Sequence, residues 1–174
     1  KVLGMPNAHF SVAVEMEEGR YASSGADSVE FLLAPNPGEP LKPVKTIASG
    51  GELSRVMLAL KSAFAEADRV PTLVFDEVDA GIGGAVARVV GEKLAALGRT
   101  HQVLCVTHLP QVACFGQAHF SVAKQVAGGR TKVAVDRLDG GRRLEAIALM
   151  LGGREATVAS RKHAKELLEA STLL

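Results

Sequence analysis

The sequence is poor in aromatic residues and has almost no excess of either charge. Phe, Trp and Tyr make up 4% of its 174 residues, Trp is absent, and the formal net charge is +1 at pH 7. So little aromatic bulk favours closely packed aliphatic layers of helix on sheet. Because the charges nearly balance, the overall charge does not predict nucleic-acid binding, and any basic surface must come from local clustering.

Cysteine is scarce as well. Only Cys105 and Cys114 are present, and no C-x-x-C or Cys/His ligand spacing occurs. Both lie in apolar stretches, so we interpret them as buried thiols in a reducing compartment rather than redox or metal-binding groups. The sequence also has no apolar stretch of membrane-spanning length and no signal peptide. We therefore expect a cytoplasmic protein without a membrane partner, and the initial Lys1 suggests a piece of a longer one.

An apolar run that ends in two carboxylates is the first functional signal. Residues 73–75, LVF, precede Asp76 and Glu77, which is the pattern of a buried parallel strand whose charged end emerges at the carboxyl edge of a sheet. Open α/β folds bind ligands at that edge. Adjacent carboxylates suit a Mg²⁺-nucleotide, because one can hold the metal's water shell while its neighbour orients an attacking water. A solvated acidic turn is the alternative.

Two further stretches favour nucleotide chemistry. Residues 49–55, SGGELSR, begin a run with helical spacing that predicts a helix over 51–67. A small hydroxyl residue and two glycines leave the backbone N–H groups of the helix start open to a phosphate, and the helix dipole adds positive charge. Downstream, apolar residues 103–106 end in Thr107 and His108. A strand-helix-strand unit would bring both polar strand ends to one sheet edge.

These three motifs, in this order, resemble the second half of an ABC-type ATPase head: a signature motif, a Walker B motif with its D-loop, and a switch histidine. The segments SGGELSR, FDEVDAGIGG and VTHLPQVA are similar to those of the RecN family, bacterial DNA-repair relatives of the SMC proteins, and Ala48 stands where the wider family usually has leucine. The resemblance implies one domain, 1–174, with an α/β fold. It would be the C-terminal lobe of such a head, a mainly parallel sheet flanked by helices with added antiparallel strands.

The resemblance also implies ATP and Mg²⁺ as ligands, with a role for each site residue. Asp76 would hold Mg²⁺ through its water shell, Glu77 would polarise the attacking water, and His108 would contact the γ-phosphate. The signature residues would bind the nucleotide of an opposing head. Without the resemblance, Asp79 is a turn former and His108 a structural histidine. The implied nucleotide-binding residues are Ser49, Gly50, Gly51, Glu52 and, in the D-loop, Asp79.

One motif of such a head is missing, because no G-x-x-x-x-G-K-[ST] occurs. Without it there is no cradle for the α- and β-phosphates and no phosphate lysine, so the chain alone is expected not to hydrolyse ATP. The resemblance places that loop in an N-terminal lobe upstream, beyond a coiled coil.

Further implied partners are a second identical head engaged by ATP, double-stranded DNA ends and recombination proteins at the bacterial nucleoid. Two alternatives stay open: the head of another SMC-like or ABC ATPase, and a non-catalytic dimerisation or DNA-docking module.

The remaining segments predict strands and helices around this unit. Alternating apolar residues predict two half-buried strands that complete or extend the shared sheet, and later a hairpin. Helical spacing predicts three more helices. Basic residues near the end form either a DNA-facing patch or a solvated helix face. The segments are strands at 10–16 and 29–33 with a turn at Glu18–Gly19, a helix at 85–97, a hairpin of 120–124 and 132–138 with a turn at Gly128–Gly129, helices at 144–151 and 157–170, and the basic residues Arg154, Arg161, Lys162 and Lys165.

Overall fold

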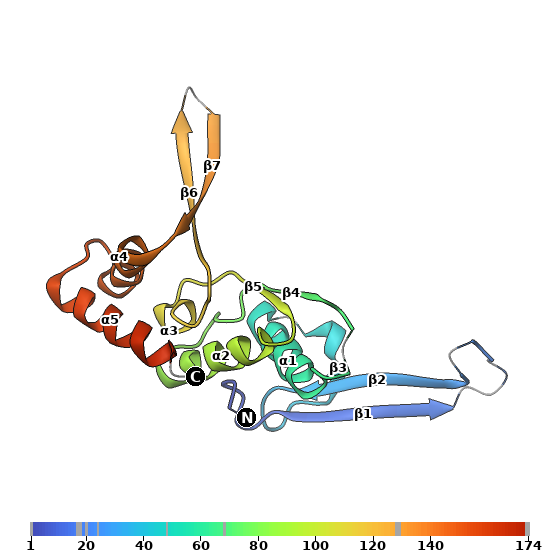
Figure 1. Cartoon of the computed structure of the whole chain (residues 1–174). Helices are drawn as coiled ribbons and strands as arrows, with labels where there is room; N and C mark the ends of the chain where they lie inside the picture. Colours follow the sequence, from blue (N-terminus) through green and yellow to red (C-terminus); the bar gives the residue numbers. More distant parts are fainter. Residues whose placement is uncertain are drawn as a thin grey trace.

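The computed structural model is a mixed α/β chain (Figure 1), which confirms the expected fold class. It describes residues 2–16, 19, 21–23, 25–47, 49–67, 69–127 and 130–172. Ala48, Glu18 of the first expected turn and the whole Gly128–Gly129 turn lie outside these residues. In chain order the elements are β1 (His9–Met16), β2 (Asp27–Ala34), β3 (Lys42–Pro43), the short 3-10 helix η1 (Val44–Thr46), α1 (Gly50–Ala63), β4 (Thr72–Phe75), α2 (Gly84–Leu97), β5 (Gln102–Cys105), α3 (Pro110–Ala113), β6 (His119–Ala127), β7 (Arg130–Leu138), α4 (Gly140–Gly152) and α5 (Val158–Thr172).

The expected strand-helix-strand unit is present. Strands β4 and β5 pair in parallel, with Leu73 opposite Val103 and Phe75 opposite Cys105, and α2 connects them. Because the strands are parallel and in register, their polar carboxyl ends meet at one edge. This edge carries the candidate site.

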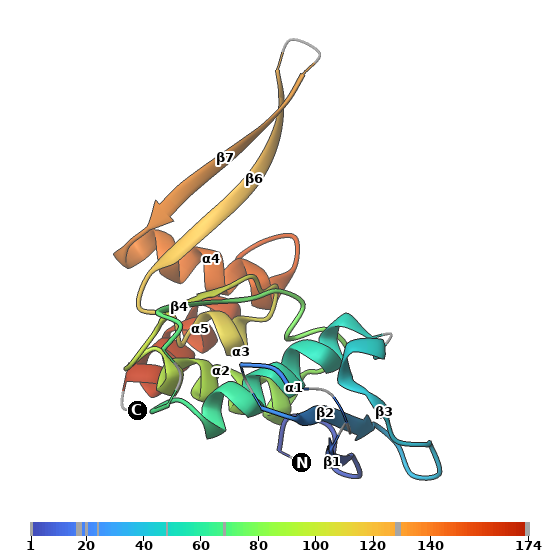
Figure 2. The same ribbon diagram turned by 90° about the vertical axis from the view of Figure 1, so that its right-hand side faces the viewer.

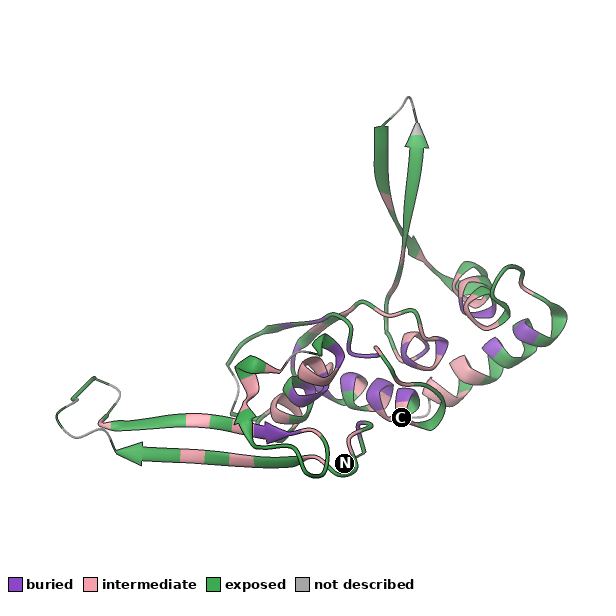
Figure 3. Ribbon diagram, turned by 180° about the vertical axis from the view of Figure 1, so that it is seen from behind, coloured by how far each residue is buried: buried purple, intermediate pink, exposed green. Residues whose placement is uncertain are grey.

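The main hydrophobic core lies between this parallel pair and the helices on one side of it. Figure 1 shows α1 and α2 on the same side of β4 and β5, and the buried residues concentrate in these helices (Figure 3). Side chains of β4 alternate, so every second residue faces the helices. The core residues are Leu3, Leu58, Leu73, Phe75, Val78, Ala87, Val90, Leu94, Leu97 and Val112.

The other face of the parallel pair is open, which corrects the expectation of a buried strand. Val74 is 67% exposed and Leu104 is 50% exposed. The reason is that the helices packed on β4 and β5 cover one face only, so alternate residues of an otherwise apolar run remain in solvent. The open face is an apolar surface that this part of the chain does not cover.

Helix α1, Gly50–Ala63, is shorter than the 51–67 predicted, and only some of its apolar residues are buried. Its buried residues are Gly51, Arg55, Val56 and Leu58, whereas Met57 and the following Phe64 are exposed. Met57, with Leu53, lines a hollow between α1 and β4, whose other walls include Leu73, Val74 and Phe75. The sequence periodicity therefore located the helix, but not all of its apolar residues are buried.

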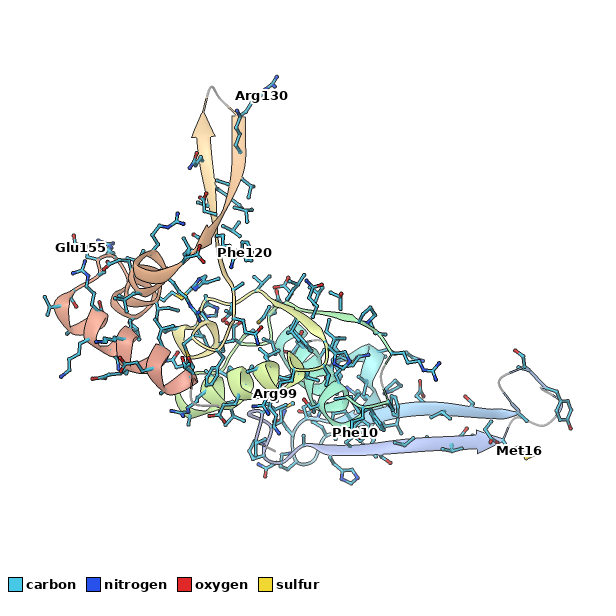
Figure 4. All side chains as sticks on the ribbon, in the orientation of Figure 1. Phe10, Met16, Arg99, Phe120, Arg130 and Glu155 are labelled. Carbon is cyan, nitrogen blue, oxygen red and sulfur yellow. The ribbon has the colours of Figure 1, made fainter. Side chains whose placement is uncertain are left out.

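The two antiparallel hairpins form as predicted, but the first is less buried than expected, because Leu33 is the only one of its alternating apolar residues that is buried. Strands β1 and β2 join β3 in a sheet separate from β4 and β5, so they do not extend the parallel sheet among the described residues. Both hairpins project from the helical body (Figures 1 and 2), with Phe10 and Phe120 near their bases and Met16 and Arg130 at their far ends (Figure 4). Leu33 and Ala34, at the base of the first hairpin, are buried, whereas most other apolar residues of the two hairpins are exposed. The exposed apolar residues are Phe10, Val12, Val14, Met16, Val29, Phe31, Phe120, Val122, Val126, Val133 and Val135.

Helices α4 and α5 pack together around a small second core of Ile147, Ala148 and Ala164. Of the basic residues expected at this end, Arg161 is paired with Glu145 through Nε at 2.7 Å, and Lys165 lies 3.8 Å from Glu169. These pairs partly offset the positive charge. No helix in the described part of the chain is long and apolar enough to span a bilayer.

Candidate functional site

The two carboxylates after β4 are exposed at the edge of the parallel pair, as predicted. The backbone N–H of Glu77 donates to Asp76 Oδ1 at 2.9 Å, and the Asp76 carbonyl accepts from Ser54 Oγ at 2.6 Å. Glu77 has φ 55°, and it is the only non-glycine residue with positive φ in the described ranges. An L residue in this left-handed region is strained by about 1–3 kcal/mol. The chain thus turns sharply at Glu77, immediately after the strand.

The start of α1 lies directly beside Glu77. Ser49 is the N-cap, and its hydroxyl accepts from the Glu52 N–H at 3.4 Å. Ser49 and Gly50 are exposed. A side chain at Gly50 would collide with Glu77 Oε2, so the Glu77 carboxylate rests against the Gly50 backbone. Gly50 and Glu77 were predicted to act on different nucleotides, and in the structure they are neighbours within one chain.

Gly51 and Arg55 hold the segment after Glu77 against α1. A Cβ at Gly51 would lie 2.8 Å from Ala80 Cβ, so only glycine allows this approach. Arg55, 5% exposed, donates through Nη1 to the carbonyls of Ala80 at 2.7 Å and Val78 at 3.5 Å. Burial lowers the pKa of Arg55, and the charge of Glu52 opposes this shift. The helix therefore fixes the path of the loop that follows the acids.

Arg55 and Thr107 both lie in predicted motifs, but neither was predicted to have a function. For Arg55 a signal existed: it lies four residues after Gly51 and three before Leu58, the spacing of one helix face. No sequence signal pairs Thr107 with a partner 28 positions away.

Asp79 is the residue that joins the ends of the two parallel strands. Its side chain is 4% exposed, and its Oδ2 lies 3.2 Å from Nδ1 of His108, whose side chain is 76% exposed. The same oxygen accepts from Thr107 Oγ1 at 2.5 Å and from the His108 N–H at 3.0 Å. Thr107 Oγ1 in turn accepts from the Leu109 N–H at 3.0 Å. Asp79 therefore points toward the end of β5, not into solvent.

The arrangement brings the predicted residues to one edge from three elements. Asp76 and Glu77 come from the end of β4, His108 from the end of β5, and Ser49 to Glu52 from the start of α1. Within the described residues no group of three or more His, Cys, Asp or Glu side chains forms a metal cluster. A lone exposed Asp76 beside a solvent-facing edge fits a Mg²⁺ ion that keeps most of its water and takes other ligands from a phosphate.

Cys105 borders this edge, and its thiol is expected to be largely protonated. Burial raises the pKa of its thiol to about 12, with smaller contributions from Asp79 and then Asp76. Burial also raises the pKa of Cys114. The interpretation of both as buried thiols is confirmed for Cys114, which is buried, while Cys105 is partly buried.

Neither thiol should react with iodoacetamide in the folded chain at pH 8. Alkylation requires the thiolate, and a thiol of pKa about 12 is ionised to only about one part in 10⁴ at that pH. Mass spectrometry after timed labelling measures the modified fraction. In urea, where the thiols regain their ordinary pKa of about 8.5, both should label within minutes. Labelling of Cys105 at equal rates in native and urea-treated samples would contradict its assigned environment.

Comparison with known proteins gives close relatives in sequence but no matching family model. The chain is 52% identical over 172 residues to a DNA repair protein RecN of Xylella fastidiosa, covering 96% of this chain and 31% of that protein. It is 48% identical over 180 residues to RecN of Streptomyces coelicolor, covering 97% and 32%. RecN of Halalkalibacterium halodurans is 43% identical over 175 residues, covering 99% and 31%. The chain thus spans about a third of the length of these curated relatives.

Solved structures share the fold at much lower identity. An Smc head domain with a coiled coil and joint from Pyrococcus yayanosii has a TM-score of 0.57 and 21% identity, covering 88% of this chain and 27% of that one. An Smc head domain with an extended coiled coil from Pyrococcus furiosus, bound to the C-terminal domain of ScpA, has a TM-score of 0.52 and 22% identity, covering 76% and 31%. At this identity the likeness shows the fold alone, which this chain shares with these two head domains.

Proposed function

On the premise that this chain is RecN-type sequence along nearly its whole length and has the fold of an SMC head, we propose that it is the C-terminal half of an ATPase head in a bacterial DNA repair protein. The complete protein would bind and hydrolyse ATP with Mg²⁺. ATP binding would engage two heads, and hydrolysis would release them. The protein would work in the cytoplasm at the nucleoid, on double-stranded DNA ends and with recombination proteins.

The observation that carries this proposal is the shared edge. Asp76 and Glu77 leave β4 next to the point where His108 leaves β5, and Asp79 joins the two strand ends through contacts of 3.0 Å and 3.2 Å to His108. Parallel strands with polar carboxyl ends are where α/β folds bind nucleotides. Acids that activate water and a histidine that reaches a phosphate need this proximity.

In the proposed site each group has one task. Bound Mg²⁺ would neutralise charge on the phosphates, and Asp76 would hold its water shell. Glu77 would accept a proton from, and orient, the water that attacks the γ-phosphate. His108 would contact that phosphate. Ser49, Gly50, Gly51 and Glu52 would bind the nucleotide of the opposing head, through the N–H groups and the positive dipole end of a helix start at which Ser49 and Gly50 are exposed and Gly51 is buried.

The open face of β4 and β5 supports the inference that a segment outside this chain packs on it. Val74 and Leu104 are exposed there, and Leu53 and Met57 line the adjoining hollow. This chain contains no Walker A motif. We infer that the N-terminal lobe of the same protein supplies the phosphate cradle and covers this face. Apolar burial would stabilise that assembly.

Mixing the chain with such a lobe tests the proposal. We expect no ATP hydrolysis by this chain alone and Mg²⁺-dependent hydrolysis by the pair, measured as phosphate release at concentrations that permit dimers. Replacing the Walker A lysine of the lobe is the control, because the pair should then fail. An inactive pair that nevertheless forms a stable complex would favour a non-catalytic docking module instead.

A further inference from the structure

The buried carboxylate of Asp79 is used three times by the segment that ends β5. Its Oδ2 accepts hydrogen bonds from the Thr107 hydroxyl and the His108 backbone N–H, and it lies 3.2 Å from Nδ1 of the His108 ring, close enough for an ion pair. The two hydrogen bonds fix the backbone on which the ring stands. The ion-pair contact restricts the ring, whose side chain is 76% exposed. An exposed histidine without such a contact would rotate freely between staggered orientations.

The chemistry of the acceptor determines the proton arrangement on the ring. A carboxylate can only accept, so the nitrogen that faces Asp79 Oδ2 must carry a hydrogen. In the neutral ring the proton therefore lies on Nδ1, and Nε2 is left facing away from Asp79. A phosphate oxygen also only accepts, so a ring in contact with one needs a second proton on Nε2.

We propose that Asp79 is a positioning residue for His108: its Oδ2 holds the Nδ1–H form of the ring and aims Nε2 at the phosphate. The proposal rests on the function proposed above and deepens it. It moves Asp79 from the residues that bind nucleotide to those that orient a binding group. Thr107 also donates to this oxygen, but the His108 backbone N–H keeps the carboxylate turned toward β5 without it.

Nuclear magnetic resonance of the nucleotide-free chain tests the contact directly. Long-range proton-nitrogen correlations distinguish Nδ1–H from Nε2–H histidine, at a pH where imidazole is neutral. We expect Nδ1–H for His108 and the Nε2–H form, which free imidazole side chains prefer, for the exposed His9. In Asp79→Asn the amide NH₂ can donate to Nδ1, so the Nδ1–H to Nε2–H ratio should fall about tenfold or more.

Two variants separate positioning from a merely structural function. Asp136→Asn makes the same chemical change on an exposed residue of β7 and should leave the His108 spectrum unchanged. Thr107→Val removes the hydroxyl but leaves the ring contact, so the Nδ1–H form should persist. If Thr107→Val shifts the ratio as much as Asp79→Asn does, the effect is a general loosening of the strand ends and the proposal fails.

The wild-type spectrum decides the matter even if Asp79→Asn does not fold. A His108 ring with the same proton form as His9 would overturn the proposal. In the assembled head, Asp79→Asn should lower kcat by about 10- to 100-fold, the cost of a misplaced group, with ATP affinity little changed. Unchanged kcat would remove the functional part of the proposal. The spectra need no nucleotide. A spectrum that contradicts the contact between Asp79 and His108 therefore leaves the function assigned to Glu77 unaffected, and a wrong assignment of Glu77 leaves the contact unaffected.

Discussion

Glu77→Gln is expected to lower kcat for ATP by about 10²–10⁴-fold in the assembled head, while ATP binding is retained. The amide keeps the size of the carboxylate but cannot accept the proton of the attacking water. Glu77 is exposed at the strand end, so no burial cost changes with its charge. Both side chains carry the same Cβ, so the strain of φ 55° is unchanged as well. Engaged dimers should accumulate, because release would require hydrolysis.

Single-turnover phosphate release and nucleotide titration, run together, measure this prediction. Glu155→Gln is the matched control, since Glu155 is exposed in the turn between α4 and α5, far from the parallel strand ends (Figure 4). It should behave as the wild type. Normal turnover in Glu77→Gln would count against the assignment of Glu77 as the residue that activates water. Loss of ATP binding would instead indicate that the charge of Glu77 is required for nucleotide binding.

Ser49→Arg is expected to abolish ATP-dependent dimerisation while each head still binds ATP. Ser49 is an exposed N-cap at the start of α1, where the proposal places the phosphates of the opposing nucleotide. A long side chain there would occupy the space of that phosphate. Light scattering with and without ATP measures the dimer, and nucleotide titration of the dilute monomer checks binding. Dimers that form with unchanged ATP dependence would refute the trans assignment of this helix start.

Loss of the cap itself must be separated from this steric effect. Ser49 accepts a hydrogen bond from the Glu52 N–H at 3.4 Å, and Ser49→Arg removes it. Ser49→Ala removes the same cap without adding bulk, at a cost of about 0.5–2 kcal/mol in helix stability. It keeps the backbone N–H groups of the helix start free of added bulk, so it should dimerise far better than Ser49→Arg. Equal loss of dimers in both variants would mean that the cap, and not the open space before Gly50, is what the interface needs.

Periodicity and turn residues predicted most of the secondary structure. The parallel strands, the helix between them and both hairpins occur where apolar patterns placed them, because these elements depend on neighbours within a few positions. Exposure was predicted less well. Val74 and Leu104 lie in apolar runs that look buried, yet they face solvent because no described helix covers that side of the sheet. A pattern records which side chains are apolar, but not what packs on them.

Some features of the candidate site were likewise predictable from the sequence, and others were not. The residue types and order of the acids, the glycine-rich helix start and the histidine were readable from the sequence, since each follows a local pattern. The burial of Asp79 was not, because its partners Thr107 and His108 lie 28 and 29 positions away. The same holds for Arg55, whose bond to the Ala80 carbonyl spans 25 positions. Contacts at such separations exist only once the helices and strands have packed.

The sequence by itself therefore determined the chemical groups of this protein and the strand ends that carry them. It also determined what is missing, a phosphate-binding loop. Only the tertiary structure decided that the Glu77 carboxylate rests on the Gly50 backbone, that Asp79 faces inward to hold the histidine, and that one face of the parallel pair is uncovered. The physical reason is that side-chain periodicity reports local geometry, whereas partners and coverage result from close packing between distant segments.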